Sequence, residues 1–314
     1  MAKWNLVADV GGTKISAAVI DAEGQIAYRK AVPTQASDGI VAVTERLAGL
    51  LRELAHTARD LQPRACSVAA PGLIDAAAGE IRFAANLPGA QNYPLRQRLE
   101  ELLGLPVFID NDLRLHALGE SHFGAAKGCQ NFLFVAVGTG VGGALFLGGK
   151  PYRGAQHSAG EIGHIPIEAG PTALACACGR RGCLEAYASG PAIAAHFQRR
   201  AAEIGLELAA PLPDLKEIAR WLEQAGPVGE LAREAVAFGG DALGRGLGIA
   251  ANLIDPELII LGGGVAQAGK IWLKAMRHAM DEITLNRYED SEIQLSQLGE
   301  DAALLGAAVL AQNS

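Results

Sequence analysis

Three of the five cysteines in this 314-residue chain lie within eight residues, in the segment CACGRRGC. A histidine, His164, lies shortly before the first of them, Cys176. One imidazole nitrogen and three thiolates satisfy a tetrahedral zinc ion and leave no open position, which makes such a site structural. The segment lacks the C-x-x-C motif of a redox pair, and an odd number of cysteines argues against a disulfide framework. The sequence therefore predicts a structural Zn²⁺ site with the ligands His164, Cys176, Cys178 and Cys183.

Glycine-rich loops follow three segments of strand-like sequence. In DVGGTK, residues 9–14, a Gly-Gly turn lets backbone N–H groups approach an oxyanion, and Asp9 can hold the cation that accompanies a phosphate. A plain hairpin turn is the alternative for this loop. The second loop, GTGVGG, matches the dinucleotide fingerprint, but ALFLGGKPY follows it as a strand and not as a helix, so that interpretation is rejected. With the third loop, LGGGV at residues 261–265, the pattern indicates a phosphate-bearing nucleotide as ligand.

Two polar residues, Asn111 and Asp112, directly follow the predicted strand PVFID. Open α/β sheets place their ligands at this end of a strand. Asp112 can cap the following helix, or it can be a general base that deprotonates a substrate hydroxyl while Asn111 binds a neighbouring hydroxyl. Arg114 and His116 are expected on the surface of that helix.

The elements that must position these residues form two similar halves. The opening segment, from Trp4 to Val32, predicts a β-meander, and FLFVAV, GTG and VGGALFLGGKPY repeat it after Asn131, which suggests a duplicated domain. Helices are expected near residues 40–58, 95–104, 191–205, 229–253 and 270–282, and the segment FAANLPGAQNYP is expected to be a loop. The alternation of strands and helices predicts an α/β fold with two domains, 1–118 and 119–300, the second holding the zinc-binding segment 164–183.

Composition and charge restrict the class of protein. The chain is 50% hydrophobic and carries a net charge of −7 without runs of Lys or Arg, so we expect a globular protein with no nucleic-acid partner. The N-terminus lacks the pattern of a signal peptide, and no stretch approaches the roughly 18 uninterrupted apolar residues of a membrane-spanning helix. We therefore expect a cytoplasmic protein with no membrane partner.

Seven motifs in this order, DVGGTK, NLPG, IDND, VGTGVGG, GEIGH, CACGRRGCLE and LGGG, resemble the ROK family of sugar kinases and sugar-responsive repressors. The resemblance runs over nearly the whole chain. It implies an actin-like, hexokinase-type ATPase fold with two lobes around a cleft, a C-terminal helix at about residues 301–314 that returns to the first lobe, and a homodimer.

The resemblance also implies roles for individual residues. Asp112 is expected to be the catalytic base for the 6-hydroxyl of a sugar. The expected sugar-binding residues are Gly72, Asn86, Asn111, Glu161, His164 and Glu185. The expected residues for ATP and Mg²⁺ are Asp9, Gly11, Gly12, Thr13, Lys14, Thr139, Gly140, Gly262 and Gly263, with Asp9 facing the magnesium ion and the last two near adenosine.

The sequence departs from the family pattern directly after the expected base, Asp112. Where the family commonly has small residues after Asn-Asp, this chain has LRLH at residues 113–116, which leaves the packing beneath the base as the open question.

We expect an ATP-dependent glucose kinase, because GEIGHI and CLEAYASG are most similar to glucokinase-like members. Kinases of N-acetylmannosamine, N-acetylglucosamine or fructose are the alternatives. A sugar-responsive repressor is the more remote one, because only eight residues precede Asp9 and leave no room for a DNA-binding domain.

Overall fold

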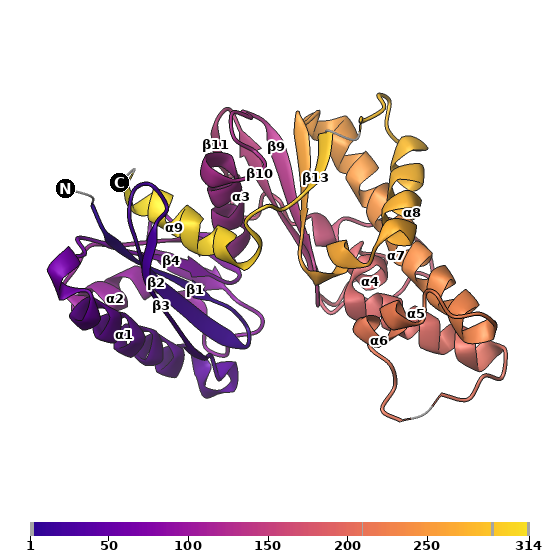
Figure 1. The fold of residues 1–314 in the computed structure, drawn as a ribbon, viewed down its shortest axis with the longest axis horizontal. Helices are drawn as coiled ribbons and strands as arrows, with labels where there is room; N and C mark the ends of the chain where they lie inside the picture. The colour runs from indigo at the N-terminus through magenta and orange to yellow at the C-terminus, as the bar shows by residue number, and fades with distance from the viewer. Residues whose placement is uncertain (1–2, 209, 290–291, 313–314) are drawn as a thin grey trace. The chain divides into compact units, whose positions relative to one another are not determined.

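A computed structural model describes residues 3–208, 210–289 and 292–312 of the chain (Figure 1). The chain forms two compact units, of which the first contains Met1–Gln130, Ala144–Ala159 and Ser296–Ser314, and the second contains Asn131–Gly143 and Gly160–Leu295. The expected domain bounds, 1–118 and 119–300, stay a prediction. Among the described residues, no helix combines the length and the apolar character that crossing a membrane requires.

The first sheet is the predicted meander extended by two parallel strands. Its order is β3-β2-β1-β4-β8. Strands β1, β2 and β3 pair antiparallel, whereas β4 is parallel to β1 and β8 is parallel to β4. The bounds are Asn5–Val10 for β1, Lys14–Ile20 for β2, Ile26–Pro33 for β3, Cys66–Ala70 for β4 and Val107–Asn111 for β8. Because β4 and β8 run parallel, the polar residues that follow them lie at one edge of the sheet.

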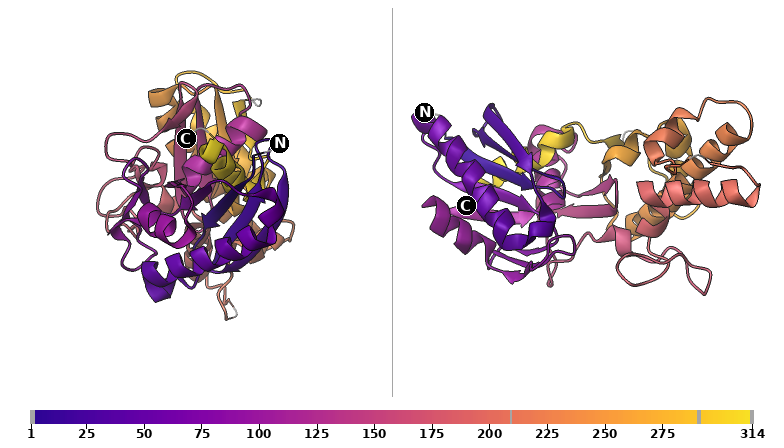
Figure 2. Two further views of the ribbon diagram at one scale, coloured as in Figure 1. Left: turned by 90° about the vertical axis from the view of Figure 1, so that its left-hand side faces the viewer. Right: turned by 90° about the horizontal axis from the view of Figure 1, so that it is seen from below.

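Helices cover both faces of this sheet (Figures 1 and 2). Helices α1 (Gly39–Thr57) and α2 (Leu95–Leu103) pack on one face, where Leu47 and Leu51 are buried with Leu6 of β1. Helices α3 (Asp112–Phe123) and α9 (Ala302–Gln312) lie on the other face. Of the predicted last helix at 301–314, residues 313 and 314 lie outside the described residues.

Helices α3 and α9 approach each other so closely that only glycine fits at the crossing. A Cβ on Gly306 would lie 1.8 Å from the carbonyl oxygen of Leu115, and one on Gly119 would lie 2.3 Å from that of Ala302. The buried carboxylate of Glu120 fastens the chain that leads into α9, since its Oε1 accepts hydrogen bonds from the Ser296 hydroxyl at 2.6 Å and the Leu298 N–H at 3.1 Å.

The second sheet repeats the topology of the first. Its order is β11-β10-β9-β12-β13, again a three-strand meander followed by two parallel strands. The bounds are Phe132–Val137 for β9, Val141–Leu147 for β10, Lys150–Tyr152 for β11, Leu258–Gly262 for β12 and Ile293–Leu295 for β13. Strands β9 and β10 match β1 and β2 in length and in their place in the sheet order, which confirms the duplicated meander. The strand after GTG also confirms that this loop does not open a dinucleotide-binding helix.

Helix α7 (Pro227–Ile254) is the longest element of the second unit and packs against α4, α5 and α8. The bounds of the others are Glu185–Ala188 for α4, Gly190–Glu203 for α5, Leu215–Arg220 for α6 and Lys270–Asp281 for α8. The short helices α4 and α6 were not expected from the sequence.

A third, three-stranded sheet occupies a region that the sequence analysis assigned partly to a loop. It has the order β5-β6-β7, with β5 at Leu73–Asp75, β6 at Glu80–Phe83 and β7 at Gln91–Tyr93. The expected loop FAANLPGAQNYP thus contains the end of β6 and all of β7, and the expectation was wrong there. Strands of three or four residues are too short to show the alternation on which a sequence prediction relies.

The close approach of α3 and α9 predicts that alanine at Gly306 destabilises the protein. Alanine at Gly49, which lies outside this crossing, should stabilise it. Gly306→Ala should lower the free energy of unfolding by about 3 kcal/mol, because the new methyl group collides with the backbone of α3. Gly49→Ala is the matched control: Gly49 lies in α1 with nothing within 4 Å of an added Cβ, so alanine should stabilise the protein by about 0.5 to 1 kcal/mol. Urea denaturation followed by circular dichroism measures both, and equal effects of the two substitutions would contradict the packing.

Candidate functional site

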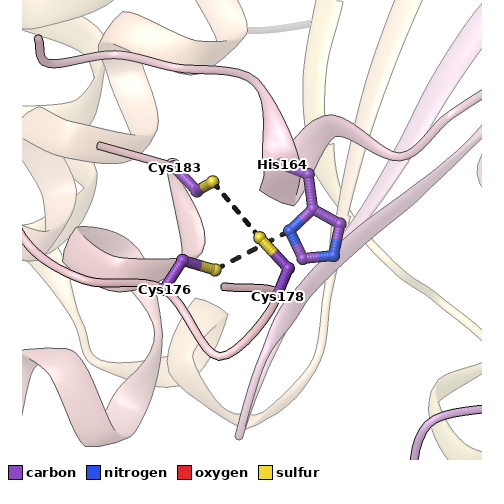
Figure 3. A group of neighbouring side chains, drawn as sticks. All are labelled: His164, Cys176, Cys178 and Cys183. Atoms are coloured by element: carbon purple, nitrogen blue, oxygen red, sulfur yellow. Dashed lines mark hydrogen bonds between the residues drawn. The ribbon is translucent and has the colours of Figure 1, made fainter. Parts of the chain in front are cut away.

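The side chains of the predicted zinc ligands converge in the second unit (Figure 3). One potential ligand atom from each of His164, Cys176, Cys178 and Cys183 lies within 4.8 Å of the others. The Cys176 sulfur is 3.8 Å from Nδ1 of His164, and the Cys178 and Cys183 sulfurs are 3.7 Å apart. Ligands on a tetrahedral zinc ion are separated by roughly 3.4 to 3.8 Å, given Zn–S and Zn–N bonds of about 2.3 and 2.0 Å. The four residues therefore fit a structural zinc ion.

The thiols of this cluster have perturbed proton affinities. Burial, together with hydrogen bonds to the neighbouring thiols, raises the pKa of Cys183 to about 12, whereas a hydrogen bond from the Arg180 backbone lowers the pKa of Cys178. Three thiolates this close repel one another, so a bound divalent cation is what would allow all of them to ionise.

His164 was expected both to bind zinc and to bind sugar. Its Nδ1 faces the sulfurs, while the other ring nitrogen points away from them (Figure 3). A metal on Nδ1 would leave Nε2 for the second expected role and would fix the tautomer that Nε2 presents.

Glu185 links the cysteine cluster to the second glycine loop. It begins α4, and its Oε2 accepts a hydrogen bond from the N–H of Val141 at 3.0 Å. Its Oε1 lies 3.8 Å from the Cys176 sulfur. The carboxylate is therefore held from two sides, whereas Glu161 is exposed just before the 3₁₀ helix Ile162–His164.

A pocket of about 750 Å³ lies in the second unit beside the predicted nucleotide loops. Thr139 from the loop after β9 and Gly264 and Val265 from the segment after β12 contribute to its wall. Gly262 and Gly263, expected near adenosine, directly precede these two residues, and Gly140 follows Thr139. The rest of the lining comes mainly from α5 and from residues 212–219.

The part of this pocket that helix α6 supplies was not expected from the sequence. Asp214 caps α6 by accepting a hydrogen bond from the Glu217 N–H at 2.9 Å, and both Asp214 and Lys216 line the pocket. The signal was present, because D-L-K-E has the spacing of a capping box, in which an acidic or amide residue follows the cap by three positions.

In the first unit, Asn111 and not Asp112 caps helix α3. Its Oδ1 accepts hydrogen bonds from the N–H groups of Leu113 at 3.0 Å and Arg114 at 3.2 Å. The capping alternative for Asp112 was therefore wrong. Asp112 is the first residue of the helix, and its Oδ1 accepts hydrogen bonds from Nδ2 of Asn111 and from the N–H of Leu113, both at 2.9 Å.

The Asn111 amide also holds the backbone at Gly72, its Nδ2 donating to that carbonyl at 3.0 Å. Gly72 has a φ of +89°, and a Cβ there would lie 2.2 Å from the carbonyl oxygen of Phe83, so only glycine suits the position. Asn86, another expected sugar-binding residue, is exposed in the loop between β6 and β7.

Asp9 and Asp112 influence each other electrostatically. Burial raises the pKa of Asp9 to about 6, the charge of His116 opposes the rise, and the Asp112 carboxylate adds to it. Burial likewise raises the pKa of Asp112, again opposed by His116. Carboxylate oxygens are the ligands Mg²⁺ prefers, so this acidic environment around Asp9 fits a magnesium ion.

The remaining residues of the first loop are solvent-accessible. Gly12, Thr13 and Lys14 are exposed, and the Lys14 ammonium lies 2.7 Å from a carboxylate oxygen of Glu300. Any part that Lys14 has in binding phosphate would compete with this ion pair.

Arg114 contradicts its predicted place on the helix surface. It is 2% exposed, and its guanidinium pairs at 2.9 Å with the carboxylate of Asp110, which is 0% exposed. A second guanidinium, that of Arg153, binds the other carboxylate oxygen of Asp110 at 2.5 Å. The available signal was only the presence of opposite charges four residues apart, because Asp110 lies in β8 and Arg114 in α3. His116 is half-buried, and its Nδ1 lies 2.9 Å from the backbone carbonyl oxygen of Asp112.

Comparisons with known proteins agree with this geometry. The ROK family model matches residues 6–314. A glucokinase from Halalkalibacterium halodurans is 35% identical, with 98% of this chain and 94% of the relative covered. An N-acetylmannosamine kinase from Escherichia coli is 34% identical, with 98% of each chain covered. The crystal structure of a ROK family glucokinase from Streptomyces griseus in complex with glucose and AMPPNP is 31% identical with a TM-score of 0.81, covering 99% of this chain and all of that one.

The cysteine cluster predicts about one zinc ion per chain in the purified protein. Cys178→Ser should remove this zinc and lower the midpoint of thermal unfolding, because the metal joins two separate segments. Cys129 lies outside the cluster, so the Cys129→Ser protein should keep the zinc. Atomic absorption measures the metal content, and a Cys178→Ser protein with unchanged zinc would contradict the site.

Proposed function

This chain belongs to the ROK family, and from that membership we propose that it is an ATP-dependent hexose kinase that phosphorylates the 6-hydroxyl of glucose. The observation that carries the proposal is the Asn111–Asp112 pair at the carboxyl end of β8. There a helix cap holds a carboxylate with a raised pKa in one orientation. Relatives named glucokinase over nearly the full length of the chain support the reaction class.

Asp112 would act as the general base. Phosphoryl transfer needs an attacking hydroxyl in line with the leaving group and a group that accepts its proton, with little covalent work by the protein. The two hydrogen bonds that Asp112 accepts from Asn111 and Leu113 both end on Oδ1. We assign Oδ2 to the sugar hydroxyl. A raised pKa makes the carboxylate a stronger proton acceptor once it is ionised.

The nucleotide-binding residues would supply electrostatic stabilisation. The N–H of Gly11 already donates to the carbonyl of Lys14 at 3.0 Å. The groups that would bind phosphate oxygens are therefore the backbone N–H groups of Gly12 and Gly140 and the hydroxyls of Thr13 and Thr139. The pocket beside Thr139 and Gly264 has room for a nucleoside. Asp9 would face a magnesium ion, which neutralises phosphate charge when bound.

Sugar binding would use the hydroxyl-binding residues expected from the family. Glu161, His164 and Glu185 lie at or beside the zinc-binding segments, while Asn86 and Asn111 belong to the first unit. Zinc would do no chemistry in this arrangement. It would fix the segments around His164 and Cys183, and with them the orientation of the imidazole and the position of Glu185, which follows Cys183 by two residues.

N-acetylmannosamine is the second candidate substrate, because a relative with that activity in its name is nearly as similar as the glucokinases. The two sugars differ in the group on the second carbon. A kinase for the N-acetylated sugar needs space for an acetamido group, and one for glucose does not.

We also propose that the enzyme works in the cytoplasm as a homodimer, without a nucleic-acid or membrane partner. The net charge of −7 supports the absence of a nucleic-acid partner.

A coupled assay of ADP release with a panel of sugars tests this function. Glucose should give the highest kcat/KM, at least about tenfold above N-acetylmannosamine, N-acetylglucosamine and fructose, which is the discrimination that a clash with one added group provides. Near-equal values for glucose and N-acetylmannosamine would contradict glucose specificity. The absence of ADP release with every sugar would contradict the kinase itself.

A further inference from the structure

Arg114 is one of the few charged side chains that are buried in the described part of the first unit. Its Nη1 donates hydrogen bonds to Oδ1 of Asp110 at 2.9 Å and to the carbonyl of Ile74 at 3.4 Å. Its Nη2 donates to the carbonyl of His157. One guanidinium thus joins β8, β5 and the segment that follows β11.

Asp110 completes this arrangement. Its Oδ1 also accepts a hydrogen bond from the N–H of Asn111 at 2.8 Å, and its Oδ2 accepts from Nε and Nη2 of Arg153 at 2.9 and 2.5 Å. The carboxylate is therefore saturated, with a backbone N–H and two guanidinium groups around it. Charge-assisted hydrogen bonds of this kind are the strong ones in a buried environment.

The ion pair of Asp110 and Arg114 restrains the backbone around the proposed base, because the two residues flank that base in the chain. Asp110 directly precedes Asn111 and Asp112, and Arg114 follows them after one residue. A shift of the junction between β8 and α3 would separate Asp110 from Arg114 and leave buried charge unpaired. The pair thus fixes the backbone on both sides of the proposed base.

We propose that Arg114 is a positioning residue for phosphoryl transfer: by clamping Asp110, Ile74 and His157 together, it holds the Asp112 carboxylate in its reactive orientation. This inference deepens the hexose kinase function proposed above and rests on it. A displacement of a catalytic group by about 1 Å can lower a rate by about 100-fold, so the clamp acts on kcat.

Two substitutions of Arg114 test the proposal in the full-length protein. Arg114→Met keeps the length of the side chain and removes its donors. Arg114→Lys keeps one charge for Asp110, but an ammonium lacks the planar fork that reaches three acceptors at once. Arg245→Met is the matched control, since Arg245 also forms an i, i+4 ion pair, with Asp241 at 2.8 Å, but on the exposed surface of α7.

The measurements are kcat with saturating glucose and ATP, the dissociation constant of glucose by calorimetry, and the folded fraction by circular dichroism. We expect kcat per folded molecule to fall about 10- to 100-fold for Arg114→Met and less for Arg114→Lys, with glucose affinity nearly unchanged. Arg245→Met should match the wild type. If Arg114→Met does not fold, a loss of kcat in folded Arg114→Lys protein supports the proposal alone.

A purely structural role for Arg114 gives a different result. Activity would then fall only in proportion to the folded fraction, and kcat per folded molecule would stay within twofold of the wild type for every folded variant, which would overturn the proposal. Wild-type protein that phosphorylates no hexose would refute the proposed function instead, so the two failures are distinguishable.

Discussion

The side-chain amide of Asn111 joins three parts of the first unit. Its oxygen caps helix α3, and its nitrogen donates to the carbonyl of Gly72 and to the carboxylate of Asp112. The end of β4, the end of β8 and the start of α3 are thereby fixed relative to one another. The orientation of the proposed base depends on this amide, because the amide supplies one of the two hydrogen bonds, from Asn111 and Leu113, that Oδ1 of Asp112 accepts.

Two aspartates on either side of Asn111 show how the surroundings decide the role of a carboxylate. Asp110 is bound by two guanidinium groups and a backbone N–H, so it serves to hold the backbone. Asp112 has a raised pKa because the effect of burial outweighs the opposing effects of the His116 charge and of the hydrogen bonds from Leu113 and Asn111. The same chemical group is thus structural in one place and suited to accept a proton in the other.

Much of the site could be predicted from the sequence because its chemistry rests on short motifs. The spacing of His164 and the three cysteines predicted a cluster that the structure assembles, and the repeated meander predicted two sheets of equal topology. The buried state of Arg114 could not be predicted so directly. Its partners Ile74 and His157 are far from it in the chain, and only the fold brings them to the guanidinium.

The same reason explains the missed sheet and the missed part of the pocket. Strands β5 to β7 are stabilised by pairing with one another, which leaves no periodic signal in three or four residues. Helix α6 has six residues, and its relevance to the pocket follows from tertiary packing and not from its sequence. Motifs therefore indicated the candidate residues, while the packing around them required the structure.

The measurement that tests the role of Asp112 most directly compares glucose binding and phosphoryl transfer in Asp112→Asn protein. The amide keeps the size of the side chain and its hydrogen bonds to the backbone but cannot accept the proton of the 6-hydroxyl. We expect a dissociation constant for glucose close to that of the wild type and a kcat lower by about 10²- to 10⁴-fold. A kcat within tenfold of the wild type would contradict the role of Asp112 as the base.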